Sequence, residues 1–285
     1  MTSQRTSVDI PIQPWFADHS FNGKTVFPAV ETMLLLGKQI SKLFPQTDIR
    51  VMENVSFGKL LEIPPGCIHI SGLIEYEKHE NGLIAAKLLT RVQAKTLTRL
   101  KQHGEVFFPS ATISKYTSTE ENLKPKGDPL VEVPAEKVYR ELVPFGPSYH
   151  TLQETLYLSE KNAWGKLLAP TMPVSASVLK ILGSPFPLDG AFHAACVLGQ
   201  QFADFVPFPV ALSRRSILQP TEPGGKYFTK VSLTARSDQE MIFDLTIFDE
   251  DSQVCEIVNG IRMRDVSAGR IKPPEWIRKR DTGEN

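Results

Sequence analysis

The segment Asp18-His19-Ser20-Phe21-Asn22-Gly23-Lys24-Thr25-Val26-Phe27-Pro28 places a histidine, a glycine and a proline at the spacing H-x3-G-x4-P. With six His, 18 Gly and 22 Pro in 285 residues, about 0.03 such matches are expected by chance. Glycine lets the backbone approach a ligand closely, and proline suits the first turn of a helix. The segment therefore predicts an active-site loop followed by a helix, although His19 taken alone also fits a capping or surface histidine.

Two apolar helices are expected, one in each half of the chain. Large apolar residues recur at helical spacing from Ala29 to Phe44, just before Pro45, and again from about Leu188 to Phe205. Runs rich in β-branched and aromatic residues accompany each helix and predict strands. These strands are 49–61, 67–76, 83–94 and 97–108 in the first half, and 152–159, 163–168, 210–218, 227–235, 241–248 and 254–264 in the second. Turns are expected at Asn81-Gly82 and at Asp249-Glu250-Asp251-Ser252.

The order of these elements predicts a duplicated α+β unit with antiparallel strands rather than an alternating βαβ fold. We expect an N-terminal unit over residues 1–110, a linker over 111–134, a C-terminal unit over 135–270 and a tail over 271–285. The chain contains neither G-x-G-x-x-G nor a G-x4-G-K-[ST] loop, so the sequence offers no recognisable nucleotide site.

Charge and cysteine content disfavour several classes of function. Thirty-two Lys and Arg residues balance 32 Asp and Glu residues, which argues against binding to nucleic acid or to an anionic membrane. Cys67, Cys196 and Cys255 are odd in number and far apart, which predicts reduced thiols instead of a zinc site or a disulfide framework. The N-terminus lacks a signal segment and no run reaches ~18 apolar residues, so we expect a cytoplasmic protein.

The remaining histidines show no metal-ligand pattern. His69, His79 and His103 lie in strand-like or turn regions without matched carboxylates, and we expect them to be structural or exposed. His150 either approaches the site or faces solvent. Arg214-Arg215 offers a contact for a phosphate, but a solvated pair is the favoured interpretation.

The second apolar helix opens with Pro187-Leu188-Asp189-Gly190-Ala191-Phe192-His193. This order puts Asp189 in the first turn and His193 one turn later on the same face, so a carboxyl group and an imidazole converge. By itself the pair also fits an acid favoured by the helix dipole next to a half-buried histidine.

With both motifs in view, the chain resembles the dehydratase domain of polyketide synthases. That family has a double hot-dog fold, in which two fused units, each a long central helix wrapped by an antiparallel sheet, share one active site. The family shows H-x3-G-x4-P in its first unit and D-x3-Q/H in its second, which here correspond to His19, Gly23 and Pro28 and to Asp189 and His193. The resemblance spans most of the chain, with the motifs in the family's order.

A third family signature, Y-G-P-x-F, is present in altered form as Phe145-Gly146-Pro147-Ser148-Tyr149. Phe145 stands at the family's tyrosine, so one hydroxyl is missing, and Tyr149 stands at the phenylalanine. After Pro28 the family usually has glycine where this chain has Ala29, and the family's glutamate is closer, at Glu31. The resemblance implies a set of substrate-binding residues, namely Gly23, Pro28, His193, Phe145, Gly146, Pro147 and Tyr149.

The resemblance implies loss of water from a 3-hydroxyacyl thioester, with His19 as the base and Asp189 as the acid. An unperturbed imidazole pKa of ~6.5 suits proton abstraction near neutrality. An aspartic acid must hold a proton to act as an acid, so we expect burial to raise the pKa of Asp189 against the helix dipole. We also expect a neutral His193 in the active form, and a backbone N–H near Gly23 as the donor to the thioester oxygen.

The implied protein is a 3-hydroxyacyl-[acyl-carrier-protein] dehydratase, a carbon–oxygen hydro-lyase of polyketide and fatty acid biosynthesis. Its substrate would arrive on the phosphopantetheine of an acyl carrier protein or synthase module, with no separate cofactor or metal, and the protein would be a monomer or a homodimer. Two alternatives stay open at this stage. One is a double-bond isomerase or cyclase on the same fold, and the other is a non-catalytic acyl-binding module, which the loss of the tyrosine hydroxyl at Phe145 permits.

Overall fold

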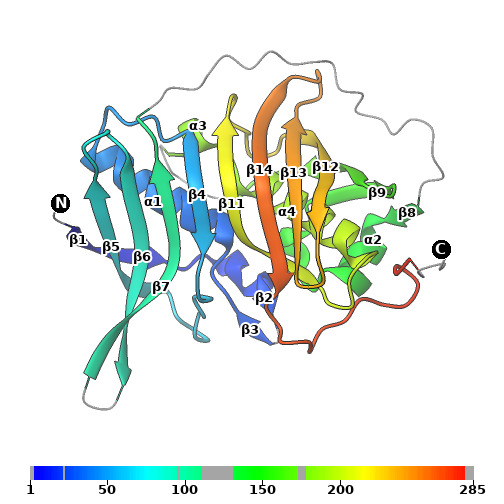
Figure 1. Ribbon diagram of the computed structural model, residues 1–285, viewed down its shortest axis with the longest axis horizontal. Helices are drawn as coiled ribbons and strands as arrows, with labels where there is room; N and C mark the ends of the chain where they lie inside the picture. The colour runs from blue at the N-terminus through cyan, green and yellow to red at the C-terminus, as the bar shows by residue number, and fades with distance from the viewer. Residues whose placement is uncertain (1–2, 22, 95–96, 111–130, 173–177, 280–285) are drawn as a thin grey trace.

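The computed structural model describes residues 3–21, 23–94, 97–110, 131–172 and 178–279. Twelve of the strands in these ranges form one antiparallel sheet in the order β1-β5-β6-β7-β4-β11-β14-β13-β12-β10-β9-β8. The first five belong to the N-terminal half and the other seven to the C-terminal half, so the two halves meet where β4 pairs with β11 (Figure 1). The β4–β11 pairing therefore joins the sheets of the two halves into one continuous sheet.

The strands of the N-terminal half are β1 (Gln4–Pro11), β4 (Val51–Phe57), β5 (His69–Lys78), β6 (Ile84–Ala94) and β7 (Leu97–Phe108). Those of the C-terminal half are β8 (Val131–Pro134), β9 (Leu152–Leu158), β10 (Asn162–Leu168), β11 (Pro207–Ile217), β12 (Lys226–Arg236), β13 (Glu240–Phe248) and β14 (Val254–Asp265). The expected turns both form: Gly82 adopts φ +83° between β5 and β6, and Asp249 opens the turn between β13 and β14.

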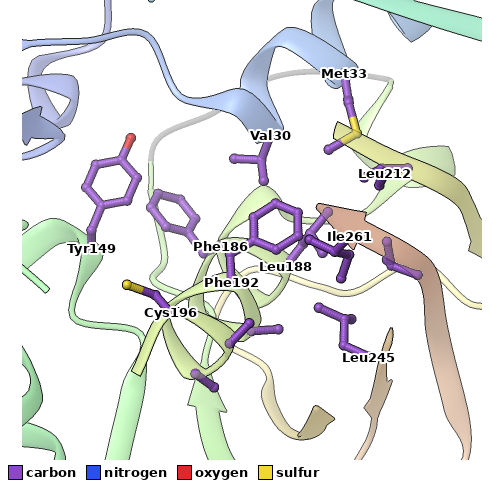
Figure 2. Close-up of a cluster of buried hydrophobic side chains, with 14 of the residues drawn as sticks. Val30, Met33, Tyr149, Phe186, Leu188, Phe192, Cys196, Leu212, Leu245 and Ile261 are labelled. Carbon is purple, nitrogen blue, oxygen red and sulfur yellow. The ribbon is translucent and has the colours of Figure 1, made fainter. Parts of the chain in front are cut away.

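Each half carries one long helix against its sheet, α1 (Ala29–Leu43) and α4 (Pro185–Gln200). Helix α1 is amphipathic and ends just before Pro45, as its spacing predicts. Helix α4 is apolar on nearly all sides, and every one of its residues is buried. Figure 2 shows Val30 and Met33 of α1 facing Leu188 and Phe192 of α4, so the two helices share one core.

Short elements complete the structure and position the site. They are the turns η1 (Pro14–Asp18), η2 (Val138–Leu142) and η3 (Pro147–Tyr149), the helices α2 (Ala135–Lys137) and α3 (Leu179–Leu182), and the small hairpin β2 (Ser20–Phe21) and β3 (Lys24–Thr25). No helix among the described residues is both long and apolar enough to cross a membrane.

The structure corrects the expected start of the second helix. Helix α4 begins at Pro185, three residues before Leu188, because proline is compatible with the first turn. Asp189 therefore lies in the second turn, and the first turn contains no acidic residue. The helix also ends at Gln200 instead of Phe205, where bonds from Gln201 to Leu198 and from Phe202 to Gly199 tighten the chain.

The expected linker 111–134 lies for the most part outside the described residues, but its last four residues form β8. This strand and β1 were not expected from the sequence. Both are edge strands of the sheet, and each pairs with one neighbour only, β8 with β9 and β1 with β5. An edge strand needs less apolar surface than a central strand, which explains its weak sequence signal.

Candidate active site

His19 lies between η1 and β2, and its side chain is 8% exposed. Its Nδ1 lies 2.9 Å from the carbonyl oxygen of Val26, which is held across the β2–β3 hairpin. Because a carbonyl only accepts, Nδ1 carries the hydrogen and donates it, which leaves Nε2 with a free lone pair. Burial lowers the pKa of His19 below its ordinary 6.5, against the opposing effect of the Asp189 charge. The imidazole is therefore neutral near pH 7 and able to accept a proton at Nε2.

Two aromatic rings of the altered third signature hold the His19 ring. Phe145 stacks on it with centroids 4.3 Å apart and an interplanar angle of 15°, and Tyr149 packs at 5.0 Å and 58°. Phe145 also lies 5.2 Å from the His193 ring, so it contacts both imidazoles. Tyr149 is buried, and its hydroxyl has no hydrogen-bond partner among the described residues. Tyr149 therefore does not supply a hydrogen bond in place of the one absent at Phe145.

Asp18 ties the third signature to the first. Its backbone oxygen accepts from the Gly146 N–H at 2.7 Å, and its Oδ2 accepts from the Ser148 N–H at 2.8 Å. A Cβ on Gly146 would lie 2.6 Å from the Asp18 carboxyl carbon, so this close approach requires glycine. The Gly146-Pro147 pair thus positions Phe145 and Tyr149 around His19.

Asp189 and His193 project from α4 and are 5% and 3% exposed. Asp189 Oδ2 and His193 Nε2 lie 3.0 Å apart, as the i,i+4 spacing predicts. The angles at this contact fall outside hydrogen-bond geometry, and both atoms are buried without a hydrogen-bond partner among the described residues. Two polar atoms that are close together and unsatisfied form a place where a ligand hydroxyl can bind both.

The electrostatics of Asp189 differ from the sequence expectation. Burial does raise its pKa, but the charge and proximity of His193, together with the charge of His19, outweigh burial, so the net direction is downward. The Asp189 carboxyl therefore favours its ionised form in this structure, because of the two neighbouring imidazoles.

A cavity of about 400 Å³ connects these groups. It is lined by His19, Phe145, Asp189 and His193, by Ala29 at the start of α1, and by apolar residues that include Phe21, Phe27, Phe192, Cys196 and Phe208. The candidate acid and base thus come from different halves of the chain and line the same space. This volume is within the range of small-molecule sites, and the apolar wall suits an acyl chain.

The structure does not bring every expected residue to the cavity. Gly23 is exposed at the tip of the β2–β3 hairpin with φ +72°, where it serves the turn, and it does not line this cavity. Pro28 is buried as the residue before α1, and Gly146, Pro147 and Tyr149 support the site without lining the cavity. These four residues therefore support the residues that line the cavity.

Tyr139, on η2, is a site residue that the sequence analysis missed. Its hydroxyl lies 3.3 Å from His193 Nδ1, and the two rings meet edge to face at 5.7 Å. It lies six positions before Phe145, in a short segment without helical or strand periodicity, so no sequence signal marked it.

Three of the other histidines and both candidate arginines have structural partners, whereas His79 Nε2 is buried without a hydrogen-bond partner among the described residues. His103 is buried, lines the cavity, and is held by Thr90 and the Lys59 carbonyl at 2.7 Å each. His69 is exposed 3.8 Å from Asp9, and the exposed His150 bonds the Phe145 carbonyl. The expectation that Arg214 and Arg215 form a solvated pair is wrong. Arg215 is 1% exposed and forms an ion pair with Glu256 at 2.7 Å, and Arg214 forms one with Glu53 at 2.6 Å.

The three cysteines are free thiols, and burial raises the pKa of Cys196 to about 12. Among the described residues, no group of three or more His, Cys, Asp or Glu side chains is arranged to bind a metal ion.

Glu31, in the first turn of α1, is a carboxyl group with a perturbed pKa. Burial raises its pKa from 4.5 to about 7, and the nearby Asp189 charge acts in the same direction. A carboxyl group whose pKa is raised on folding stabilises the fold fully below pH 4.5, and this contribution is lost as the pH rises through 7. The Glu31 carboxylate therefore destabilises the folded protein at alkaline pH.

We expect Glu31→Gln to be more stable than the wild type at pH 8, and this advantage to shrink toward pH 5. The upper limit is about 3.5 kcal/mol, at about 1.4 kcal/mol per pKa unit for a rise from 4.5 to about 7, and partial exposure of the side chain reduces it. Denaturant unfolding at both pH values measures the difference, with Glu250→Gln on the exposed β13–β14 turn as the control. Equal stabilities of Glu31→Gln and wild type at pH 8 would contradict the assignment.

A family model described as "Polyketide synthase dehydratase N-terminal domain" matches residues 120–271, which is more than half of the chain. The chain belongs to the polyketide synthase dehydratase family. The matched residues include Phe145, Asp189 and His193, whereas His19 lies before them. No protein in the curated set matches the chain.

Solved structures of polyketide synthase dehydratase domains share the fold over nearly the whole chain. One from Brevibacillus brevis, of the trans-AT type, has a TM-score of 0.72 at 19% identity and covers 93% of this chain and 94% of that chain. The domain from the CurH module of curacin polyketide synthase has a TM-score of 0.70 at 15% identity, covering 96% and 93%. The dehydratase-cyclase domain of ambruticin biosynthesis has a TM-score of 0.69 at 15% identity, covering 92% and 91%. The double hot-dog fold predicted from the sequence is thereby confirmed.

Proposed function

We propose that this polyketide synthase dehydratase family member removes water from a 3-hydroxyacyl thioester and releases the 2-enoyl thioester. The observation that carries this proposal is the cavity, in which a neutral His19 and two unsatisfied polar atoms of Asp189 and His193 meet within an apolar wall. Elimination of water requires a base for the C2 proton and an acid for the leaving hydroxyl, and these groups supply both.

His19 acts as the base in this proposal. Its Nδ1–H is engaged by the Val26 carbonyl, so Nε2 takes the C2 proton, and the Phe145 ring holds the imidazole in place. The electron pair of the C2–H bond forms the C2–C3 double bond as the C3–O bond breaks. After the product leaves, His19 returns its proton to solvent, and the acid takes up a proton from solvent to replace the one that left in the water.

Asp189 and His193 together act as the acid. The pKa of Asp189 is lowered by the neighbouring imidazoles against the effect of burial, so its carboxyl group has to take up a proton when the substrate binds before it can protonate the leaving hydroxyl. A substrate hydroxyl between Asp189 Oδ2 and His193 Nε2 receives that proton and leaves as water. Exclusion of water by an acyl chain favours the neutral form of the pair, with the proton on Asp189 and a neutral His193.

The thioester oxygen requires a hydrogen-bond donor as negative charge develops on it. Gly23 does not line the cavity, and the first amides of α1 replace it in the proposal. Ala29 lines the cavity at the N-terminus of α1, where amides have no partner within the helix and the dipole favours negative charge. We also propose that an acyl carrier protein delivers the substrate on its phosphopantetheine arm.

The experiment is turnover of 3-hydroxyacyl pantetheine thioesters, with both configurations at C3 tested separately. We expect one configuration to give the 2-enoyl thioester, seen as growth of the enoyl absorbance and loss of one water from the thioester mass. Analysis of the products separates dehydration from isomerisation and cyclisation. Binding of both thioesters without turnover of either would contradict the proposal and favour an acyl-binding module.

A further inference from the structure

Tyr139 is a buried phenol in contact with the proposed acid, and none of the three motifs contains it. It is 8% exposed, and burial raises its pKa well above its ordinary value, so it stays protonated. Its ring stacks on His150 with centroids 4.1 Å apart and an interplanar angle of 13°. Stacking and burial together hold the hydroxyl at a defined place beside His193.

The hydrogen bonds of Tyr139 determine which way its hydrogen points. The Leu152 N–H donates to Tyr139 Oη at 2.7 Å, and this N–H can only donate. The phenol hydrogen is therefore free for another acceptor, and His193 Nδ1 lies 3.3 Å away. If the phenol donates to Nδ1, a neutral His193 carries its own hydrogen on Nε2, the atom 3.0 Å from Asp189 Oδ2.

We propose that Tyr139 is a positioning residue for the acid: it turns the His193 ring so that Nε2 faces Asp189, and it fixes the exchangeable hydrogen on Nε2. This inference rests on the proposed function, because it explains how the Asp189–His193 pair is oriented to act as the acid. A phenol also accepts, so the same contact accommodates a hydrogen on Nδ1 when the imidazole is doubly protonated.

Other groups near the phenol and the imidazole do not replace this contact. His150 Nε2 is engaged with the Phe145 carbonyl, and Phe145 presents an apolar ring to His193. The Thr151 side chain also lies beside the phenol, and its buried hydroxyl makes no hydrogen bond among the described residues, so it is the one alternative partner for the phenol hydrogen. A Thr151→Val variant removes that competitor while keeping a similar shape, and it should leave the His193 tautomer unchanged.

The first measurement is ¹⁵N NMR of the ring nitrogens of neutral His193, assigned by their loss in His193→Gln. We expect the Nε2–H tautomer in the wild type and a shift of population toward Nδ1–H in Tyr139→Phe. The matched control is Tyr227→Phe, because Tyr227 is also buried and its hydroxyl also accepts a backbone N–H, from Glu222 at 2.7 Å. Tyr227 lies on β12, and its hydroxyl, unlike that of Tyr139, is not placed against His193. An Nδ1–H tautomer in the wild type, or the same tautomer in Tyr139→Phe, would overturn the proposal.

The second measurement is a double-mutant cycle on turnover. Tyr139→Phe should lower kcat roughly tenfold, the size expected for one lost hydrogen bond, and should move the alkaline limb of the pH profile. In a His193→Gln background, where no tautomer exists, the same change should cost less than about twofold. Equal losses in both backgrounds would show a purely structural role. Absence of wild-type turnover would instead refute the proposed function, while the NMR result still tests Tyr139.

Discussion

Replacing His19 with alanine is expected to lower kcat for dehydration by roughly 10²–10⁴-fold, the usual contribution of a general base. The side chain is buried, is held by the Val26 carbonyl and the Phe145 ring, and has a pKa below 6.5, so it is the neutral acceptor that the C2 proton requires. Because protonation inactivates a base, the acid limb of the wild-type pH–rate profile should lie below pH 6.5 and should be absent from the residual activity of the variant.

The matched control for His19→Ala is His69→Ala, which removes an exposed imidazole outside the cavity and should leave kcat unchanged. Thermal unfolding of both variants separates loss of chemistry from loss of fold, and His19→Gln keeps more of the buried volume. A folded His19→Gln protein with turnover within threefold of the wild type would exclude His19 as the base.

Asp189→Asn is expected to lower kcat by a similar factor, roughly 10²–10⁴-fold, because an amide cannot deliver a proton to the leaving hydroxyl. The change is nearly isosteric, so α4 and the cavity keep their shape. It also removes the negative charge that acts on His19, which should lower the pKa of His19 further and move the acid limb of any residual activity to lower pH.

Asp204→Asn is the control for the second variant, since Asp204 is exposed after the end of α4 and lies outside the cavity lining. The decisive comparison uses kcat measured at saturating substrate. Retention of full kcat with only a raised KM would mean that Asp189 binds the substrate and does not act as part of the acid.

Much of the fold follows from local sequence patterns. Helix α1 has an amphipathic spacing and a proline just beyond its end, and the central strands are rich in β-branched and aromatic residues. The predicted start of α4 is three residues too late, because Pro185 and Pro187 look like the end of a loop although both fit a first helical turn. Edge strands β1 and β8 were missed because such strands need less apolar surface.

The site was predictable only where a motif fixes a spacing. His19, Asp189 and His193 follow from two short motifs, and the structure places all three around one cavity. Tyr139 and the raised pKa of Glu31 depend on contacts between segments far apart in the sequence, which no local pattern encodes. The predicted rise of the Asp189 pKa is wrong for the same reason. Burial can be foreseen from the sequence, but the opposing effect of two imidazoles depends on where the fold places them.

The most direct test of the central claim is covalent trapping with a 3-alkynoyl pantetheine thioester. A base that removes the C2 proton of this compound, with return of a proton at C4, yields a conjugated allene, and the same imidazole then adds to C3. We predict one adduct per chain, located on His19 by peptide mass spectrometry, and no adduct in His19→Ala. An adduct on another residue, or unchanged labelling of His19→Ala, would contradict the assignment of His19 as the group that faces C2 of the substrate.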